Sequence, residues 1–198
     1  MHIIGLTGGI ACGKSTVADM LRSCGAAIVD ADAISRSLTA PGGKALPLIR
    51  ETFGDDVFAR DGTLNRPALS QKVFGNAENL QKLNAITHPL IRQEMETQIE
   101  NCRKEGRQVL VLDVPLLFEA GMQHMADETA CVFCPEEVQI SRMNTRNGYS
   151  REEALSRIRS QWPVSQKCDL SDIVIDTNRP LEELKQAVCR LYECWLSA

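Results

Sequence analysis

Residues 6–17 read LTGGIACGKSTV, in which Gly8, Gly13, Lys14 and Ser15 fit the pattern G-x-x-x-x-G-K-[ST]. An apolar, strand-like segment, HIIGLTGG, leads into this stretch, and KSTVADMLRSCG follows it with the apolar spacing of a helix. AAIVDAD then forms a second apolar, strand-like segment. Strand, loop, helix and strand in this order are the context that a phosphate-binding loop requires. The sequence therefore predicts an α/β fold with a parallel sheet flanked by helices.

Further strand-like segments continue this pattern along the chain. The apolar runs lie at 108–118, 129–134 and 171–177. Between the last two, Ser150 and Glu153 form a capping-box pair that predicts a helix over 150–161. The C-terminal segment LEELKQAVCRLYECWL has the spacing of an amphipathic helix.

Residues 33–104 lack a strong strand-like run and are mostly polar and helical, with breaks expected at 41–44, 54–62 and 88–89. An insertion of this size between two strands suits a helical lobe for an acceptor substrate. We expect a core with the phosphate loop at 1–34, a helical acceptor-binding insertion at 35–104, core again at 105–141, a helical lid at 142–166, and the last core strand and helix at 167–198.

Composition excludes several classes of protein. A formal net charge of −4 over 198 residues lacks the basic balance of a general nucleic-acid-binding protein. No apolar run approaches the roughly 18 residues of a membrane span, and MHIIGLTGG lacks the features of a signal peptide. Cys131 and Cys134 form a C-x-x-C, but they lie in an apolar strand without a second zinc-spaced pair. We expect a cytoplasmic protein with reduced thiols, a monomer or weak homo-oligomer, with neither membrane nor nucleic acid as partner.

The phosphate loop supplies the first candidate site. Gly8 and Gly13 permit backbone geometries that a side chain would obstruct. Lys14 can bring positive charge to the β- and γ-phosphates of ATP. The hydroxyl of Ser15 can ligate Mg²⁺.

Two residues of this loop are unusual. Ala11 suits its position only if its backbone angles tolerate a side chain, a property that coordinates can test. Cys12 lies near a helix N-terminus and Lys14, where the pKa of a thiol tends to fall. We hypothesise that modification of Cys12 blocks ATP binding, although a serine-sized spacer is the simpler interpretation.

Aspartates follow the predicted strands. Asp30 and Asp32 close the segment VDAD, and alternation along a strand predicts that both lie on one face. Asp32 is the favoured candidate to accept a proton from an attacking hydroxyl or to hold Mg²⁺ through water, whereas Asp30 is interpreted as a loop-capping residue. Asp113 follows the apolar run VLVL, which is the form of a second Mg²⁺ carboxylate.

Arginines mark a predicted lid. Arg142 and Arg146 lie four residues apart and therefore on one face of a helix. A helical pair hinged at RNG suits a lid that stabilises phosphate charge and excludes water. Arg157 and Arg159 are instead interpreted as residues of a solvated helix face with neighbouring glutamates as partners.

His88 precedes a proline, and a lone histidine in this setting is more often structural than catalytic. Arg92 follows four residues later and can face the same way. This arginine is a candidate for binding an anionic substrate.

The chain carries, in this order, LTGGIACGKST, VDAD, HPLIR, VPLLFE, R-x-x-x-RNG and RIRSQ. The order and spacing of these motifs resemble those of the dephospho-CoA kinases, from residue 2 to residue 185. The phosphate loop alone is generic, whereas VDAD with HPLIR and PLLFE is specific. This family transfers the γ-phosphoryl group of ATP to the ribose 3′-hydroxyl of dephospho-CoA, the last step of coenzyme A synthesis. The resemblance implies a P-loop NTPase core, a helical CoA-binding domain and a lid, with ATP and Mg²⁺ as cofactors.

The resemblance also implies roles for residues at the nucleotide. Lys14 would act in catalysis together with Arg142 and Arg146 of the lid. Gln161 and Lys167 match the family's Q…K spacing and would contact the nucleotide or its phosphates. The phosphate cradle would comprise Gly8, Gly9, Ala11, Cys12, Gly13, Lys14, Ser15 and Thr16.

On the acceptor side, the resemblance makes Asp32 the candidate base, beside Thr7 at the strand exit. His88 and Arg92 would bind the dephospho-CoA substrate, which favours a functional role for the histidine. Ser15 and Asp113 remain the candidate metal ligands.

Some positions depart from the family's usual pattern. Glycine is usual where this chain has Ala11, and serine is frequent where it has Cys12. Aspartate is common at Asn147, and asparagine at Thr177. A lid contact by an aspartate and a nucleotide-base contact near Thr177 therefore do not carry over directly.

Two rival functions follow from the residues alone. Another small kinase acting on a nucleoside monophosphate needs the same acceptor lobe and lid, and ADP release with different acceptors would separate the two. A GTPase-like switch would need N-K-x-D and D-x-x-G motifs, and the sequence contains neither.

Overall fold

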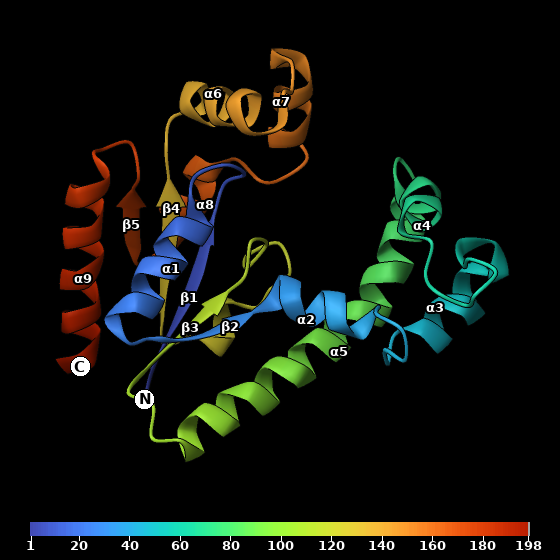
Figure 1. Ribbon diagram of the computed structural model, residues 1–198, viewed down its shortest axis with the longest axis horizontal. Helices are drawn as coiled ribbons and strands as arrows, with labels where there is room; N and C mark the ends of the chain where they lie inside the picture. Colours follow the sequence, from blue (N-terminus) through green and yellow to red (C-terminus); the bar gives the residue numbers. More distant parts are fainter. Residues whose placement is uncertain (198) are drawn as a thin grey trace. The chain divides into compact units, whose positions relative to one another are not determined.

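The computed structural model describes residues 1–197, and Figure 1 shows their helices and strands. The chain forms two compact units, one made of residues 1–30 together with the chain from Ile99 onward, the other of residues 31–98. The sequence analysis placed the helical insertion at 35–104, a range that begins and ends a few residues later than the second unit.

A five-stranded sheet forms the centre of the first unit. Its strands are β1 (His2–Gly8), β2 (Ala27–Asp30), β3 (Val109–Asp113), β4 (Glu128–Phe133) and β5 (Ile173–Asp176). Every neighbouring pair is parallel, and the order is β2-β3-β1-β4-β5. After β1, the chain crosses to β2 at one edge of the sheet. After β3, it crosses in the opposite direction, to β4. The carboxyl ends of β1 and β3 therefore border a switch point, where such sheets bind ligands.

Both faces of this sheet are covered, which confirms the predicted parallel α/β fold. On one face Ile4 and Leu6 share a core with α1 (Lys14–Cys24) and α9 (Leu181–Ser197), which run side by side in Figure 1. On the other face α8 (Val164–Leu170) packs against β4 and β1. A short 3-10 helix, η2 (Gln123–Met125), lies beside β1. Alternation of side chains along β1 directs successive residues to the two layers.

The predicted lid, 142–166, overlaps a pair of helices, α6 (Glu136–Asn147) and α7 (Arg151–Ile158), of which the first begins before the predicted range. Ser150 and Glu153 make the predicted capping box at the start of α7. Ile140, Met143 and Ala154 form a small core between these helices. Ile10 and Ala11 of the phosphate loop pack against that core, so the loop and the helix pair are joined by apolar contacts.

The second unit is helical, as predicted. It contains α2 (Ala31–Leu38), α3 (Leu46–Phe53), the 3-10 helix η1 (Asp55–Val57), α4 (Arg66–Val73) and most of α5 (Ala77–Lys104). The break expected at 88–89 is wrong, because α5 runs for 28 residues through Pro89. Proline leaves the carbonyl four residues earlier without its donor, but Ala85 is exposed and water can reach that oxygen.

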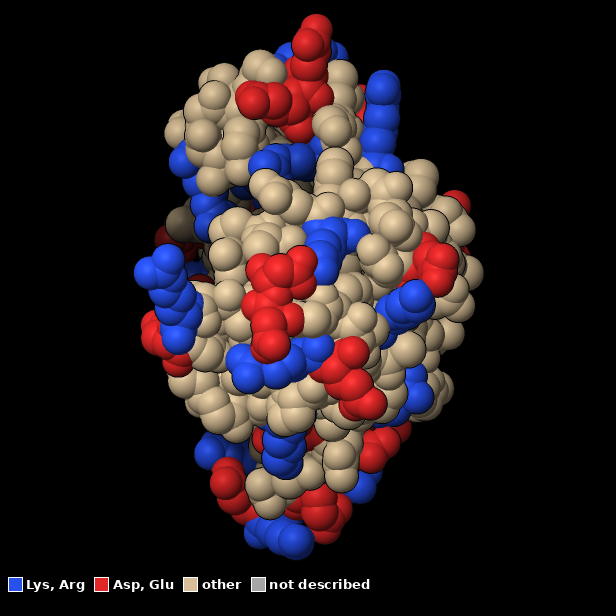
Figure 2. Space-filling model, turned by 90° about the vertical axis from the view of Figure 1, so that its right-hand side faces the viewer, with Lys and Arg blue, Asp and Glu red and all other residues tan. Residues whose placement is uncertain are grey.

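On the face that Figure 2 shows, acidic and basic side chains are interspersed, with no broad area of a single charge. Among residues 1–197, no helix combines the length and the apolar character that crossing a membrane requires.

Candidate active site

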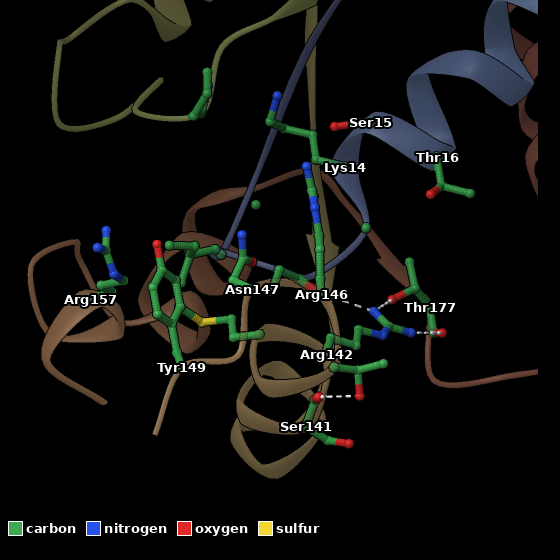
Figure 3. A pocket seen from close by; sticks show the side chains of 18 of the residues that line it. Lys14, Ser15, Thr16, Ser141, Arg142, Arg146, Asn147, Tyr149, Arg157 and Thr177 are labelled. Atoms are coloured by element: carbon green, nitrogen blue, oxygen red, sulfur yellow. Dashed lines mark hydrogen bonds between the residues drawn. The ribbon is translucent and has the colours of Figure 1, made fainter. Parts of the chain in front are cut away.

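A cavity of about 810 Å³ opens at the carboxyl end of β1, within the first unit. One wall is the phosphate loop with the start of α1, and the other walls come from α6, α7 and the segment after β5 (Figure 3). Of the predicted nucleotide-binding residues, those that line the cavity are Gly8, Gly9, Ala11, Gly13, Lys14, Ser15, Thr16, Arg142, Arg146 and Gln161.

Backbone amides make this cavity suited to hold an anion. Helix α1 begins without a side-chain cap, and its first turn carries no acidic residue. Within residues 1–197, a group of loop amides donates to no oxygen of the protein, namely those of Ile10, Ala11, Gly13, Lys14, Ser15 and Thr16. Unpaired N–H groups at a helix N-terminus, which is also the positive end of the helix dipole, form a site for phosphate oxygens.

Lys14 and Asp113 lie together beside this loop. The Nζ of Lys14 contacts Oδ1 of Asp113, and both side chains are largely buried. Asp113 ends β3, whose register pairs it with Asp30 at the end of β2. The predicted metal ligand Asp113 is therefore placed next to the loop lysine, at the edge where the sheet binds ligands.

The lid arginines have different surroundings. Arg142 donates from Nη1 to Oγ1 of Thr177 at 3.0 Å and from Nη2 to the carbonyl of Thr177 at 2.9 Å. Arg146 is exposed at the cavity wall, and its side chain makes no hydrogen bond or ion pair within the described chain. In Figure 3 its side chain extends toward Lys14. Arg146 therefore keeps its whole charge available to an anion in the cavity.

Arg157 was predicted to lie on a solvated helix face with neighbouring glutamates as partners; its side chain is exposed, as predicted, but its contacts differ. It lines the cavity, and its guanidinium carbon lies 4.3 Å from the centre of the Tyr149 ring (Figure 3). A cation over an aromatic face is attracted by the electron density of the ring. The two side chains together form a flat, partly cationic wall.

The hypothesis of a reactive Cys12 is wrong. Its side chain is fully buried in the core of the first unit, away from any reagent in solution. A hydrogen bond with Cys134, together with burial, raises the pKa of the Cys12 thiol far above its ordinary value. The helix N-terminus cannot offset these effects, so Cys12 is a neutral, serine-sized spacer at pH 7.

Two further predicted residues are also buried and bonded within the protein. Lys167 is fully buried; its Nζ pairs with Glu119 at 2.7 Å and donates to the carbonyl of Pro115 at 2.9 Å. Thr7 is also fully buried, and its hydroxyl donates to the same carbonyl at 2.9 Å. Neither lines the cavity, which corrects the predicted direct contact of Lys167 with phosphates. Both residues instead fix the chain that follows Asp113.

The carboxylates of VDAD do not share a strand face. Strand β2 ends at Asp30, and Asp32 lies in the first turn of α2, where its side chain is exposed. The argument from alternation is therefore wrong, because the chain turns into a helix between the two residues.

In the second unit, His88 and Arg92 lie one turn apart on α5. Burial, together with the charge of Arg92, lowers the pKa of His88 below its ordinary value of 6.5. His88 is therefore mostly neutral at pH 7. The Nε atom of Arg92 is buried and has no hydrogen-bond partner within the described residues, so this donor is unsatisfied.

The sequence analysis gave no role to two polar residues at the loop, Gln139 and Thr177, and it named Thr177 only as a departure from the family's usual asparagine. Thr177 follows the last strand, and the rule that ligands bind at strand ends could have indicated it. Gln139 is buried within α6, and a glutamine among apolar helix residues gives no sequence signal for its partner.

The fold and the cavity define a P-loop nucleotide-binding protein with a helical lid, the architecture of small phosphotransferases. A family model described as dephospho-CoA kinase matches residues 2–183. The chain therefore belongs to the dephospho-CoA kinase family, as its motifs had indicated.

Individual relatives agree with this assignment. A dephospho-CoA kinase from Carboxydothermus hydrogenoformans is 45% identical over 195 residues, which cover 98% of this chain and 95% of that protein. A crystal structure from Thermus thermophilus is similar with a TM-score of 0.83 and 34% identity, covering 97% of this chain and 96% of that one. The fold is also shared by dephospho-CoA kinase from Campylobacter jejuni, with a TM-score of 0.66 and 23% identity, over 100% of this chain and 98% of that one.

Proposed function

We propose that this protein transfers the γ-phosphoryl group of ATP to the ribose 3′-hydroxyl of dephospho-CoA, which gives coenzyme A and ADP. The observation that carries this proposal is the row of unpaired loop amides beside Lys14, in a chain of the dephospho-CoA kinase family. Such a row can hold the β- and γ-phosphates while Arg146 approaches from the lid. We also infer a cytoplasmic enzyme, since ATP is its phosphoryl donor, and a monomer or weak homo-oligomer.

Mg²⁺ fits the residues at the mouth of the loop. No group of at least three His, Cys, Asp or Glu side chains within residues 1–197 could hold a metal alone. Mg²⁺ at a nucleotide needs few protein ligands, because phosphates and waters supply the rest. The exposed hydroxyl of Ser15, which lines the cavity, and the carboxylate of Asp113, which contacts Lys14 beside it, would hold it. When bound, it neutralises phosphate charge.

In the proposed reaction, the 3′-hydroxyl oxygen attacks the γ-phosphorus in line with the bond to the β-phosphate oxygen. That bond breaks, ADP takes its electron pair, and the hydroxyl proton passes to the carboxylate of Asp32. Charge on the transferring group is met by Lys14, Arg146 and the loop amides. Positioning and charge stabilisation provide most of the rate enhancement, and the base contributes a smaller part.

The acceptor is assigned to the helical unit. There, Arg92 offers a charged guanidinium with an unpaired buried N–H, and His88 offers a neutral imidazole. An anionic phosphate of dephospho-CoA suits the arginine, and a ribose or amide group suits the histidine.

A comparison of acceptors tests the proposal. The protein is incubated with Mg·ATP and, in turn, dephospho-CoA, AMP and other nucleoside monophosphates, and ADP is measured. We expect release with dephospho-CoA to exceed release with every monophosphate by at least about 100-fold, the scale on which a fitted polar site discriminates. Faster release with a monophosphate would assign the protein to a different kinase reaction.

A further inference from the structure

We propose that Gln139, Arg142 and Thr177 are positioning residues that hold the phosphate loop in its anion-binding conformation by occupying consecutive loop carbonyls. The inference rests on the proposed function only in taking ATP as the ligand of the loop. It assigns Arg142, which lines the cavity, a role in holding the loop, instead of the direct contact with transferring phosphates that its place in the lid predicted.

Each of these side chains binds a different carbonyl. Nε2 of Gln139 donates to the carbonyl of Ile10 at 2.7 Å. Arg142 donates from Nη1 to the carbonyl of Ala11 at 3.3 Å. The hydroxyl of Thr177 donates to the carbonyl of Cys12 at 2.7 Å. Figure 3 shows how Arg142 and Thr177 lie beside one another.

The two flanking carbonyls are satisfied by the backbone. That of Gly9 accepts from the amide of Cys12 at 3.1 Å, and that of Gly13 from the amide of Val17 at 3.1 Å. Every carbonyl from residue 9 to residue 13 therefore has a partner inside the protein, whereas most of the amides in this stretch have none.

Anion binding depends on this arrangement, in which the carbonyls are bonded within the protein and the amides are unpaired. Rotation of a peptide unit would turn its carbonyl oxygen toward the phosphates and its N–H away from them. The attraction between the N–H and the phosphate would then be replaced by repulsion between the two oxygens. A donor fixed to each carbonyl oxygen opposes that rotation. Catalysis by electrostatic stabilisation depends on donors that are already oriented before the charge arrives.

The bracing side chains are themselves held in place. Gln139 and Thr177 are buried, 2% and 4% exposed. Arg142 also binds the hydroxyl and the carbonyl of Thr177, so one guanidinium links α6, the segment after β5 and the loop. A Cβ added to Gly9 would lie 2.7 Å from Nε2 of Gln139. Glycine at this position therefore leaves the space that Gln139 needs for its hydrogen bond to the carbonyl of Ile10.

The test compares Thr177→Val with Thr177→Ser, a pair that removes or keeps the hydroxyl at similar size. ADP affinity is measured by calorimetry without any acceptor, because this readout does not depend on the identity of the acceptor. We expect Thr177→Val to weaken ADP binding about tenfold, or about 1.4 kcal/mol. Thr177→Ser should remain within about threefold of the wild-type affinity.

Steady-state kinetics separate bracing from a purely structural role. If Thr177 holds the loop, Thr177→Val should raise KM for ATP and leave KM for dephospho-CoA unchanged. Gln139→Leu, which removes the donor to the carbonyl of Ile10, should have the same effect on the two KM values. Thr97→Val is the control, since its exposed hydroxyl donates to the carbonyl of Gln93, remote in sequence from every cavity residue.

Two outcomes overturn the inference: equal ADP affinity in Thr177→Val and wild type, or an equal loss in Thr177→Val and Thr177→Ser. Failure of the proposed function looks different. In that case dephospho-CoA is not phosphorylated by the wild type, while the affinity difference between the two Thr177 variants persists.

Discussion

Ala11 carries a backbone conformation that L-residues rarely adopt. Its φ of 58° lies in the left-handed region, and no other non-glycine residue of the described chain has a positive φ. This conformation costs an L-residue about 1–2 kcal/mol. The loop retains it because Ala11 packs against the lid core and its carbonyl is held by Arg142.

Replacement of Ala11 by valine should therefore be costly. A β-branched residue is a strong outlier in this region. We expect Ala11→Val to lower the free energy of unfolding by about 1–3 kcal/mol, measured by urea denaturation. Ala11→Gly is the matched control, which should stay within about 1 kcal/mol of wild type. Equal stability of both variants would show that the left-handed conformation is absent.

Asp32 is the residue on which the proposed proton transfer depends. Asp32→Asn keeps the size of the side chain but removes the base, so turnover should fall at least about 100-fold. The affinity for ADP should remain unchanged, since the nucleotide cavity does not include Asp32. Quench-flow or steady-state turnover together with calorimetry checks both statements. Turnover near the wild-type rate would remove Asp32 from the mechanism.

Single residues also mark the limit of sequence reasoning. Lys14 and Ser15 could be placed because the local chain alone creates a phosphate loop. Cys12 and Lys167 could not, because burial and pairing with Cys134 or Glu119 depend on segments distant in the sequence. A residue type next to a functional motif therefore predicts its reactivity only when its exposure is also known.

At the scale of elements, helices α1 and α9 bring two thiols together. The sulfur atoms of Cys24 and Cys189 lie 2.8 Å apart, and both cysteines are free. Burial, followed by the hydrogen bond with Cys189, raises the pKa of Cys24 to about 11, so the thiol of Cys24 reacts slowly at pH 7.

An azo oxidant such as diamide should join these helices at alkaline pH. The two thiols lose their protons and two electrons, a disulfide forms, and diamide is reduced to the hydrazine. We expect the free energy of unfolding to rise by about 2–4 kcal/mol, measured by urea denaturation in a Cys194→Ser background that removes the exposed thiol. Cys24→Ser is the control, and the same gain in that variant would contradict a bond between α1 and α9.

The presence of helices and strands was predicted better than the residues at which they begin and end. The strands, the capping box of α7 and the helical character of residues 33–104 follow from local patterns. The turn of VDAD into α2 and the passage of α5 through Pro89 do not. In both places neighbouring structure outweighs a local preference, which a single sequence cannot reveal.

At the scale of the whole molecule, the sequence predicted a phosphate-loop sheet with a helical insertion. The structure adds that the nucleotide cavity belongs entirely to the unit that contains the sheet, whereas Asp32, His88 and Arg92 belong to the helical unit. The account therefore divides the reaction between a unit for the phosphoryl donor and a unit for the acceptor.

The most direct measurement is the identity of the product. Wild-type protein is incubated with Mg·ATP and dephospho-CoA, and ³¹P NMR follows the phosphorus resonances. The account predicts one new phosphomonoester on the ribose 3′-oxygen for each ADP formed, and none when dephospho-CoA is left out. ADP without that phosphomonoester, or a phosphate on a different hydroxyl, would contradict it.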